Sequence, residues 1–199
     1  MGANKGEFFI QTKKTYQSRF YLVEPNQSLF DTLNVSQPDR KFKVVIAPEN
    51  KLYSFYNSKN DEAGSLNPSM AAQWQLGEME QVQGWTFNYF IKEANIGEID
   101  LIKIDIEGEE LSLLRNLSVS KLSSIKQISC EFHDFMDKSQ LNQVLEIILF
   151  LKRNNYLVLN FSNKDHRDVL FVNAKACSFF YRIIMSAFGY ILNIRRFII

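Results

Sequence analysis

The sequence is poor in residues that form covalent or metal cross-links, with two cysteines and two histidines among its 199 residues. Cys130 and Cys177 are far apart and belong to no C-x-x-C pair, which argues against a disulfide framework and against a zinc cluster. The first residues, MGANKGEFF, also lack the basic region and apolar run of a secretory signal. We therefore expect a protein of a reducing, cytoplasmic compartment, and we assign no metal ligands.

The sequence also lacks an excess of charge of either sign, because 23 basic residues balance 22 acidic ones. This balance provides no global field that would attract nucleic acid or a strongly acidic substrate, so a small or neutral ligand is favoured. A chain of this length with 46% hydrophobic residues can form one compact domain.

No uninterrupted apolar run is long enough for a membrane span of about 20 residues. The nearest approach is at residues 177–194, CSFFYRIIMSAFGYILNI, which contain Arg182 and Asn193 and are followed by two arginines. We expect a main domain over residues 1–175 and a separate apolar helix over residues 176–199. This helix is either buried, in contact with another subunit of a homo-oligomer, or lying on a membrane surface as a peripheral contact.

Apolar runs alternate with amphipathic stretches along the chain. The expected strands are at residues 20–23, 42–47, 99–106, 125–131, 156–161 and 169–172, with an edge element at 52–56. The expected helices are at residues 27–35, 86–95, 109–116 and 139–153, and residues 57–81 are expected to form a long functional or mobile loop that can include one helical turn. This order predicts an α/β fold with a mostly parallel sheet and one antiparallel C-terminal hairpin strand.

Glycines and an acid near the N-terminus form the first candidate binding site. Gly2, Asn4 and Gly6 belong to the segment GANKG ahead of a helix, where backbone N–H groups can approach a carboxylate or phosphate. Glu24 follows at the end of the first expected strand, where it could accept hydrogen bonds from ribose hydroxyls. Both patterns are also common by chance, and an acid before proline can be a solvated turn.

Acidic residues at two strand ends form the second candidate site. Alternation along a strand places Lys103, Asp105 and Glu107 on one side, at the carboxyl end where ligands of α/β sheets bind. Glu109 and Glu110 could instead only favour the helix N-terminus electrostatically, and Lys103 could pair with a neighbouring acid.

The next strand end carries Glu131 and His133, and a histidine there can take a proton from a sugar or alcohol hydroxyl. Glu131, His133 and Asp105 could alternatively bind a metal, although a single histidine with scattered acids is a weak pattern. We expect His166, which lies in the hairpin turn, at the surface.

The segment at residues 99–116, IDLIKIDIEGEELSLLRN, resembles the signature of the FkbM family of methyltransferases, in which a strand ends in an acid-rich K-x-D-x-E-G-x-E turn. Three further segments agree in order. GANKGEF resembles the Gly-rich cofactor loop of the family, YLVEPNQ its ribose-binding acid, and ISCEFH its next strand end. The resemblance extends over residues 2–172 and implies a Rossmann-like methyltransferase sheet.

The resemblance implies S-adenosylmethionine as cofactor and a hydroxyl of a sugar, glycan or related small molecule as methyl acceptor. It assigns Gly2, Asn4 and Gly6 to the methionine part of the cofactor. It assigns Glu24 to the ribose of the cofactor. It places Asp105 close to the transferred methyl, with Glu107 and His133 at the acceptor pocket.

One departure from the family concerns the start of the fold. Family members have a hydrophobic strand ahead of the Gly-rich loop, and here Met1 stands at that junction, so we expect a sheet without its first strand that binds cofactor poorly. A catalytically inactive methyltransferase-like binding or assembly module is an alternative. A nicotinamide-dependent oxidoreductase is a third interpretation, which the absence of G-x-G-x-x-G disfavours.

Overall fold

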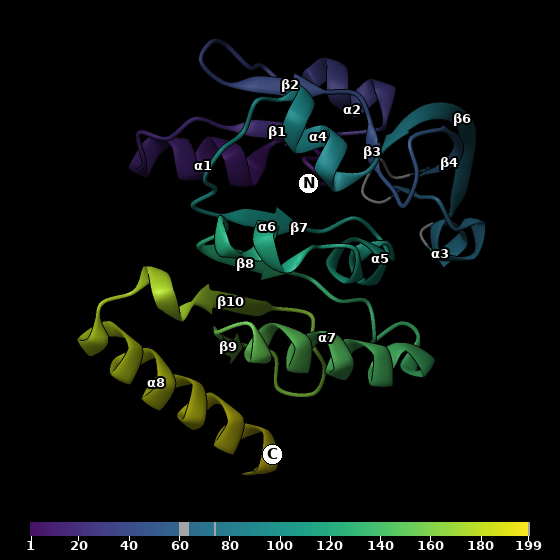
Figure 1. The fold of residues 1–199 in the computed structure, drawn as a ribbon. Coiled ribbons are helices and arrows are strands. Elements are labelled where there is room, and N and C mark those ends of the chain that lie inside the picture. Colours follow the sequence, from purple (N-terminus) through teal and green to yellow (C-terminus); the bar gives the residue numbers. More distant parts are fainter. Residues whose placement is uncertain (60–63, 74, 199) are drawn as a thin grey trace. The chain divides into compact units, whose positions relative to one another are not determined.

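The computed structural model describes residues 1–59, 64–73 and 75–198 (Figure 1). The chain forms two compact units. The first unit comprises Met1–Asn95 and Ile106–Glu109, and the second comprises Ile96–Asp105 and Glu110–Ile199. Helices and strands occur in both units, so the expected α/β class is confirmed. The domain boundary expected between residues 175 and 176 stays a prediction.

The first unit begins with a helix and a short parallel pair of strands. Its elements are α1 (Glu7–Thr15), β1 (Tyr21–Val23), α2 (Gln27–Thr32) and β2 (Arg40–Phe42). β1 and β2 pair in parallel, with Leu22 opposite Lys41. α2 begins directly after the Glu24-Pro25 turn because the side chain of Asn26 accepts a hydrogen bond from the backbone N–H of Leu29 at 3.0 Å.

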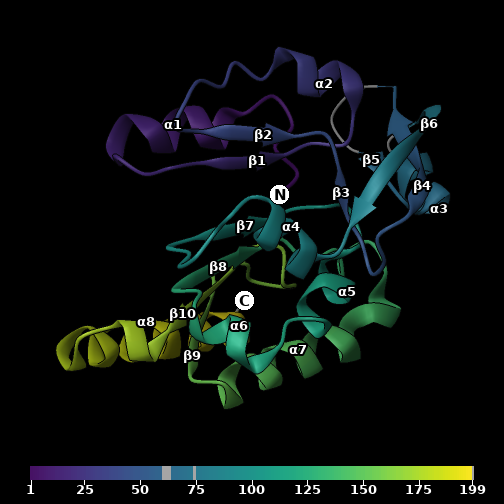
Figure 2. The same ribbon diagram turned by 45° about the horizontal axis from the view of Figure 1, so that its top comes forward.

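A second sheet of the first unit has the order β3-β6-β4-β5, and its strands are labelled in Figure 2. Its strands are β3 (Val45–Ile46), β4 (Leu52–Ser58), β5 (Gly64–Ser65) and the long β6 (Leu76–Trp85). Helices α3 (Pro68–Gln73) and α4 (Phe87–Glu93) flank β6 in sequence. Thr86 caps α4, since its hydroxyl oxygen accepts a hydrogen bond from the backbone N–H of Tyr89. Phe42 and Phe90 meet edge to face, with 5.2 Å between ring centroids.

Residues 57–81 do not form the long loop that the sequence predicted. Within the described residues they contain α3 and the first half of β6, while residues 60–63 and 74 lie outside the described part. The start of β6 was missed because its apolar side chains, Leu76 and Met79, are exposed and give no buried pattern. The strand expected at residues 42–47 is divided between β2 and β3. The element expected at an edge, β4, lies between β6 and β5.

The second unit holds one sheet of order β7-β8-β10-β9. Its strands are β7 (Ile102–Ile104), β8 (Gln127–Cys130), β9 (Tyr156–Asn160) and β10 (Val169–Asn173). Its helices are α5 (Glu110–Arg115), α6 (Val119–Ser123), η1 (Lys138–Gln140), α7 (Leu141–Arg153), η2 (Ala174–Ala176) and α8 (Phe179–Ile198). β7 and β8 are parallel, whereas β10 is antiparallel to both of its neighbours. The predicted C-terminal hairpin is therefore confirmed.

The core of this unit explains why these short runs form strands. Ile104, Ile128 and Phe171 lie on three neighbouring strands and are fully buried, and Val144 and Leu151 of α7 are buried as well. Each strand is therefore held by apolar side chains that a helix covers. The single, mostly parallel sheet expected from the sequence is not confirmed, because the strands form three sheets with pairs of both directions.

Candidate functional site

The first unit brings the N-terminal glycine segment and Glu24 together. The backbone N–H of Ala3 donates to the carbonyl oxygen of Val23 at 3.0 Å, so the segment is tied to the end of β1. The N–H of Asn4 donates to Oε2 of Glu24 at 2.7 Å. Two of the sequence-predicted cofactor residues, 20 positions apart, are thus in direct contact.

The glycines of this segment have backbone conformations that other residues adopt at a cost. Gly2 and Gly6 have φ angles of 70° and 77°, and Gly6 immediately precedes α1. A Cβ atom on Gly6 would lie 2.9 Å from the side chain of Leu33. Asn4, with φ of 49°, is also in the left-handed region that asparagine tolerates better than most residues. The segment therefore turns tightly beside Leu33, and a Cβ atom at Gly6 would require the side chain of Leu33 to shift.

Glu24 is a buried carboxylate, with 4% of its surface exposed. Oε2 accepts the N–H of Asn4, and Oε1 accepts the N–H of Asn26 at 3.0 Å. Burial raises the pKa of Glu24, and the hydrogen bonds from Asn4 and Asn26 lower it without cancelling the effect of burial. A solvated turn, the simpler interpretation of an acid before proline, does not describe this residue.

A polar network that the sequence did not suggest continues from Glu24 through the first unit. Nδ2 of Asn26 donates to Oδ1 of Asn57 at 2.8 Å, and Nδ2 of Asn57 donates to Oε1 of Glu80 at 3.1 Å. Lys43 pairs with Oε2 of Glu80 at 3.2 Å. The sequence did not suggest this network, because Asn57 and Glu80 reach it through pairing of β4 with β6.

The end of β7 presents a charged pair in the second unit. Asp105 follows the last residue of the strand, and Nζ of Lys103 lies 2.5 Å from Oδ2 of Asp105. Both side chains are about three-tenths exposed, at 30% and 28%. The predicted pairing of Lys103 with a neighbouring acid is therefore present, and it leaves Asp105 accessible to a ligand.

Glu107 does not continue the strand alternation on which its prediction was based. β7 ends at Ile104, and Glu107 and Gly108 have φ angles of 52° and 106°. The carbonyl oxygen of Glu107 accepts a hydrogen bond from the hydroxyl of Ser65 at 2.7 Å, which holds this turn within the first unit. Lys103 and Asp105 share a side as expected, but the alternation does not extend to Glu107, because a left-handed turn replaces the extended backbone there.

His133 is buried against a carboxylate that the sequence left unassigned. Its Nδ1 lies 3.2 Å from Oε1 of Glu110, and the two side chains are 3% and 1% exposed. The candidate ligand atoms of Asp105 and His133 lie within 4.8 Å of one another. Glu110 is the first residue of α5, as expected, but its side chain reaches back to the end of the neighbouring strand. A buried acid beside a histidine can orient the ring and stabilise its protonated form.

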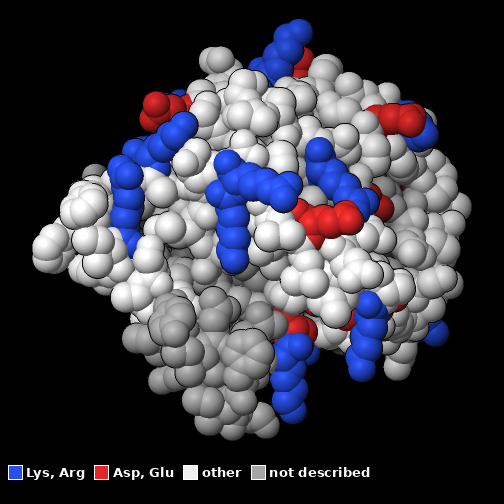
Figure 3. All heavy atoms as spheres, turned by 60° about the horizontal axis from the view of Figure 1, so that its bottom comes forward, with Lys and Arg blue, Asp and Glu red and all other residues white. Residues whose placement is uncertain are grey.

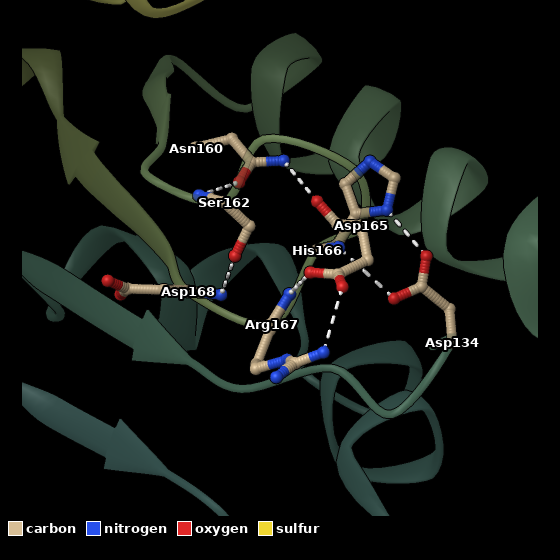
Figure 4. A network of polar contacts seen from close by, with 7 residues as sticks. All are labelled: Asp134, Asn160, Ser162, Asp165, His166, Arg167 and Asp168. Atoms are coloured by element: carbon tan, nitrogen blue, oxygen red, sulfur yellow. Dashed lines mark hydrogen bonds and ion pairs between the residues drawn. The ribbon is translucent and has the colours of Figure 1, made fainter. Parts of the chain in front are cut away.

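His166, expected at the surface, is 5% exposed. Figure 4 shows its ring directed at Asp134, with Nδ1 at 2.7 Å from Oδ2. The backbone N–H of His166 donates to the other oxygen of Asp134 at 3.2 Å. Burial raises the pKa of Asp134, but the hydrogen bonds and the charge of His166 lower it by more, so the pKa lies below its ordinary value. The surface prediction was wrong because this turn folds back on the segment that follows β8.

The comparisons with known proteins identify the family. A model of the FkbM methyltransferase domain matches residues 1–158. The chain belongs to this family. No curated protein and no solved structure matches the chain.

Both candidate sites lie within the part of the chain that the FkbM domain model covers. In the first unit, the glycine segment and Glu24 offer backbone N–H groups and a carboxylate. In the second unit, Asp105 and the pair of His133 with Glu110 offer groups that accept and hold a proton. Asp105 and His133 together supply two ligand atoms that a divalent metal could use, and the donor set of one carboxylate and one imidazole does not specify which metal.

Proposed function

We propose that this FkbM methyltransferase transfers a methyl group from S-adenosylmethionine to a hydroxyl of a sugar, glycan or related small molecule. The observation that carries the proposal is the match of the FkbM domain model to residues 1–158, which includes every residue assigned to the two candidate sites. Contacts inside each unit support the separate roles of these residues.

The residues of the first unit fit the cofactor assigned to them. Glu24 uses each carboxylate oxygen to accept one backbone N–H, and an ionised carboxylate can accept about four hydrogen bonds. Glu24 therefore retains acceptor capacity for two ribose hydroxyls. Gly2 and Gly6, whose φ angles exclude most side chains, allow the backbone of this segment to approach the methionine part. When bound, S-adenosylmethionine would supply a methyl group on a positively charged sulfur. An oxygen nucleophile can attack the methyl carbon, and the sulfur is then the leaving group.

His133 is assigned the removal of the acceptor proton. Nδ1 of His133 lies 3.2 Å from Oε1 of Glu110, and Nε2 is the nitrogen assigned to take the proton from the hydroxyl. The carboxylate of Glu110 then stabilises the positive ring that forms. Asp105, at the end of β7, is assigned the binding and orientation of the acceptor. The resemblance to the family assigns Glu107 to the acceptor as well.

The test is methyl transfer from labelled S-adenosylmethionine to a panel of monosaccharide, oligosaccharide and small alcohol acceptors. We expect Asp105→Asn to remove turnover and His133→Gln to lower kcat by about 100-fold or more, the contribution typical of a general base. Asp100→Asn is the matched control, because this carboxylate is 75% exposed and pairs with Lys126 away from the candidate sites.

Calorimetric titration with S-adenosylmethionine separates the outcomes. Cofactor binding that Glu24→Gln weakens, without turnover of any acceptor, would instead support an inactive binding module. Full turnover by the Asp105→Asn variant would contradict the role given to the end of β7. Absence of both cofactor binding and turnover in the wild-type chain would overturn the proposal as a whole.

A further inference from the structure

The C-terminal helix α8 rests on the sheet of the second unit along one face. Gly189 is buried, and a Cβ atom there would lie 3.1 Å from the side chain of Leu159 and 3.2 Å from the carbonyl oxygen of Val158. Phe188 packs near Phe161, with 6.4 Å between ring centroids. The glycine therefore lets α8 approach β9 closely, which defines the inner face of the helix.

The side of α8 away from β9 is apolar and exposed. Phe179 and Phe180 have 74% and 75% of their surface exposed, and Ile183 and Ile184 have 52% and 53%. At 3.6 residues per turn, Phe180 lies about half a turn away from Gly189 around the helix. Large side chains at this spacing form a continuous outer stripe, and exposed apolar patches of this kind mark interaction surfaces.

The charge of the C-terminal segment is of one sign. Asp168 is the last acidic residue in the chain, and four basic residues follow it: Lys175, Arg182, Arg195 and Arg196. Arg182 lies within the first turns of α8 and is exposed. Figure 3 shows Lys and Arg side chains on the face that comes forward from the bottom of Figure 1. An apolar stripe in a basic segment is complementary to a surface that is both apolar and anionic.

We infer that α8 docks on an anionic lipid surface, lying in the plane of the interface with its outer stripe inserted among the acyl chains. The exposed side chains of Lys175 and Arg182 would contact lipid phosphates. Within residues 1–59, 64–73 and 75–198, no helix is both long and apolar enough to cross a membrane, which fits a helix that lies on the surface. A second copy of the chain is a less suitable occupant, because pairing two such helices would bring like charges together with no acid to offset them.

Flotation of the full chain with lipid vesicles tests this inference. We expect binding to vesicles of phosphatidylcholine with phosphatidylserine, and at least about tenfold weaker binding to phosphatidylcholine alone, since each basic residue near an anionic surface contributes about fivefold. The double variant Phe180→Glu and Ile183→Glu should lose about tenfold or more in binding to the anionic vesicles. Arg182→Gln should reduce that binding about fivefold.

A matched double variant, Leu52→Glu and Val119→Glu, introduces the same charge at apolar residues that are 64% and 61% exposed elsewhere. It should bind vesicles as the wild type does, and circular dichroism melts should show that both double variants are folded. Equal binding by the two double variants, or no preference for anionic vesicles, would overturn the inference. Sedimentation velocity showing a dimer that only the α8 variant loses would assign the stripe to a second copy of the chain instead.

Discussion

Replacing Asp134 with alanine removes the partner of a buried histidine and should destabilise the second unit. The carboxylate accepts two hydrogen bonds from His166, one from the ring at 2.7 Å and one from the backbone N–H at 3.2 Å. Both side chains are nearly inaccessible, at 4% and 6% exposed. Loss of one member of such a pair leaves the other buried without compensation, which typically costs about 3–5 kcal/mol.

This loss should be visible in thermal and chemical unfolding. For a chain of this size, 1 kcal/mol corresponds to about 2–4 °C, so Asp134→Ala should lower Tm by about 6–20 °C. Hydrogen exchange measured peptide by peptide should assign the loss to the second unit, because both residues belong to it. Asp168→Ala is the matched control, since Asp168 is exposed in the same turn, and its effect should stay within about 0.5 kcal/mol.

The pH dependence has a definite sign. Because the folded-state pKa of Asp134 is lowered, its contribution to stability is present above the ordinary pKa of the carboxyl and is lost as the pH falls through the folded-state value. Wild type and Asp134→Ala should therefore converge in stability at strongly acidic pH. A difference below about 1 kcal/mol at neutral pH, or a difference that does not shrink in acid, would refute this description of the pair.

Two further variants test a buried hydrogen bond in the second unit and a tight turn in the first unit. Tyr156→Phe removes a buried hydroxyl that lies 2.8 Å from the carbonyl oxygens of Leu122 and Ile125, and urea unfolding should show a loss of about 1–3 kcal/mol. Since burial raises the pKa of Tyr156 to about 12, this difference should be constant below pH 10 and shrink as the pH rises through 12. Gly6→Ala should cost about 1–2 kcal/mol in the same assay, because φ is 77° there, whereas Gly97→Ala, with open space around it, should not. An unchanged Gly6→Ala variant would contradict the tight turn at the start of α1.

Elements with a strong local pattern could be predicted from the sequence. α7 has apolar residues at helical spacing and forms where expected, and the hairpin of β9 and β10 follows from two β-rich runs joined by a short polar turn. β6 could not be predicted, because its first residues lie at the surface and only Val82 and Gly84 of the strand are buried. Its pairing with β4 depends on contacts across the sheet, which no local pattern contains.

The site residues likewise divide into those that a local pattern reveals and those that depend on contacts between distant segments. The acid-rich motif at residues 103–109 and the glycine segment were visible because backbone requirements and strand ends determine them. His166 could not be placed, because its burial results from the return of a turn onto the segment after β8, a contact between residues 32 positions apart. Asn57 and Glu80 were missed for a similar reason, since strand pairing brings them to Asn26.

Glu110 shows that the sequence motif alone does not distinguish the roles of two neighbouring acids. In the sequence, Glu109 and Glu110 are equivalent candidates for the start of a helix, and both would interact favourably with its N-terminus. In the structure, Glu110 is 1% exposed and paired with His133, while Glu109 is half-buried and belongs to the turn of the first unit. A buried carboxylate is costly unless a partner compensates it, so the burial of Glu110 is tied to His133 rather than to the helix end. The proposed base and the acid that orients it are therefore supplied by two segments whose association only the fold of the second unit determines.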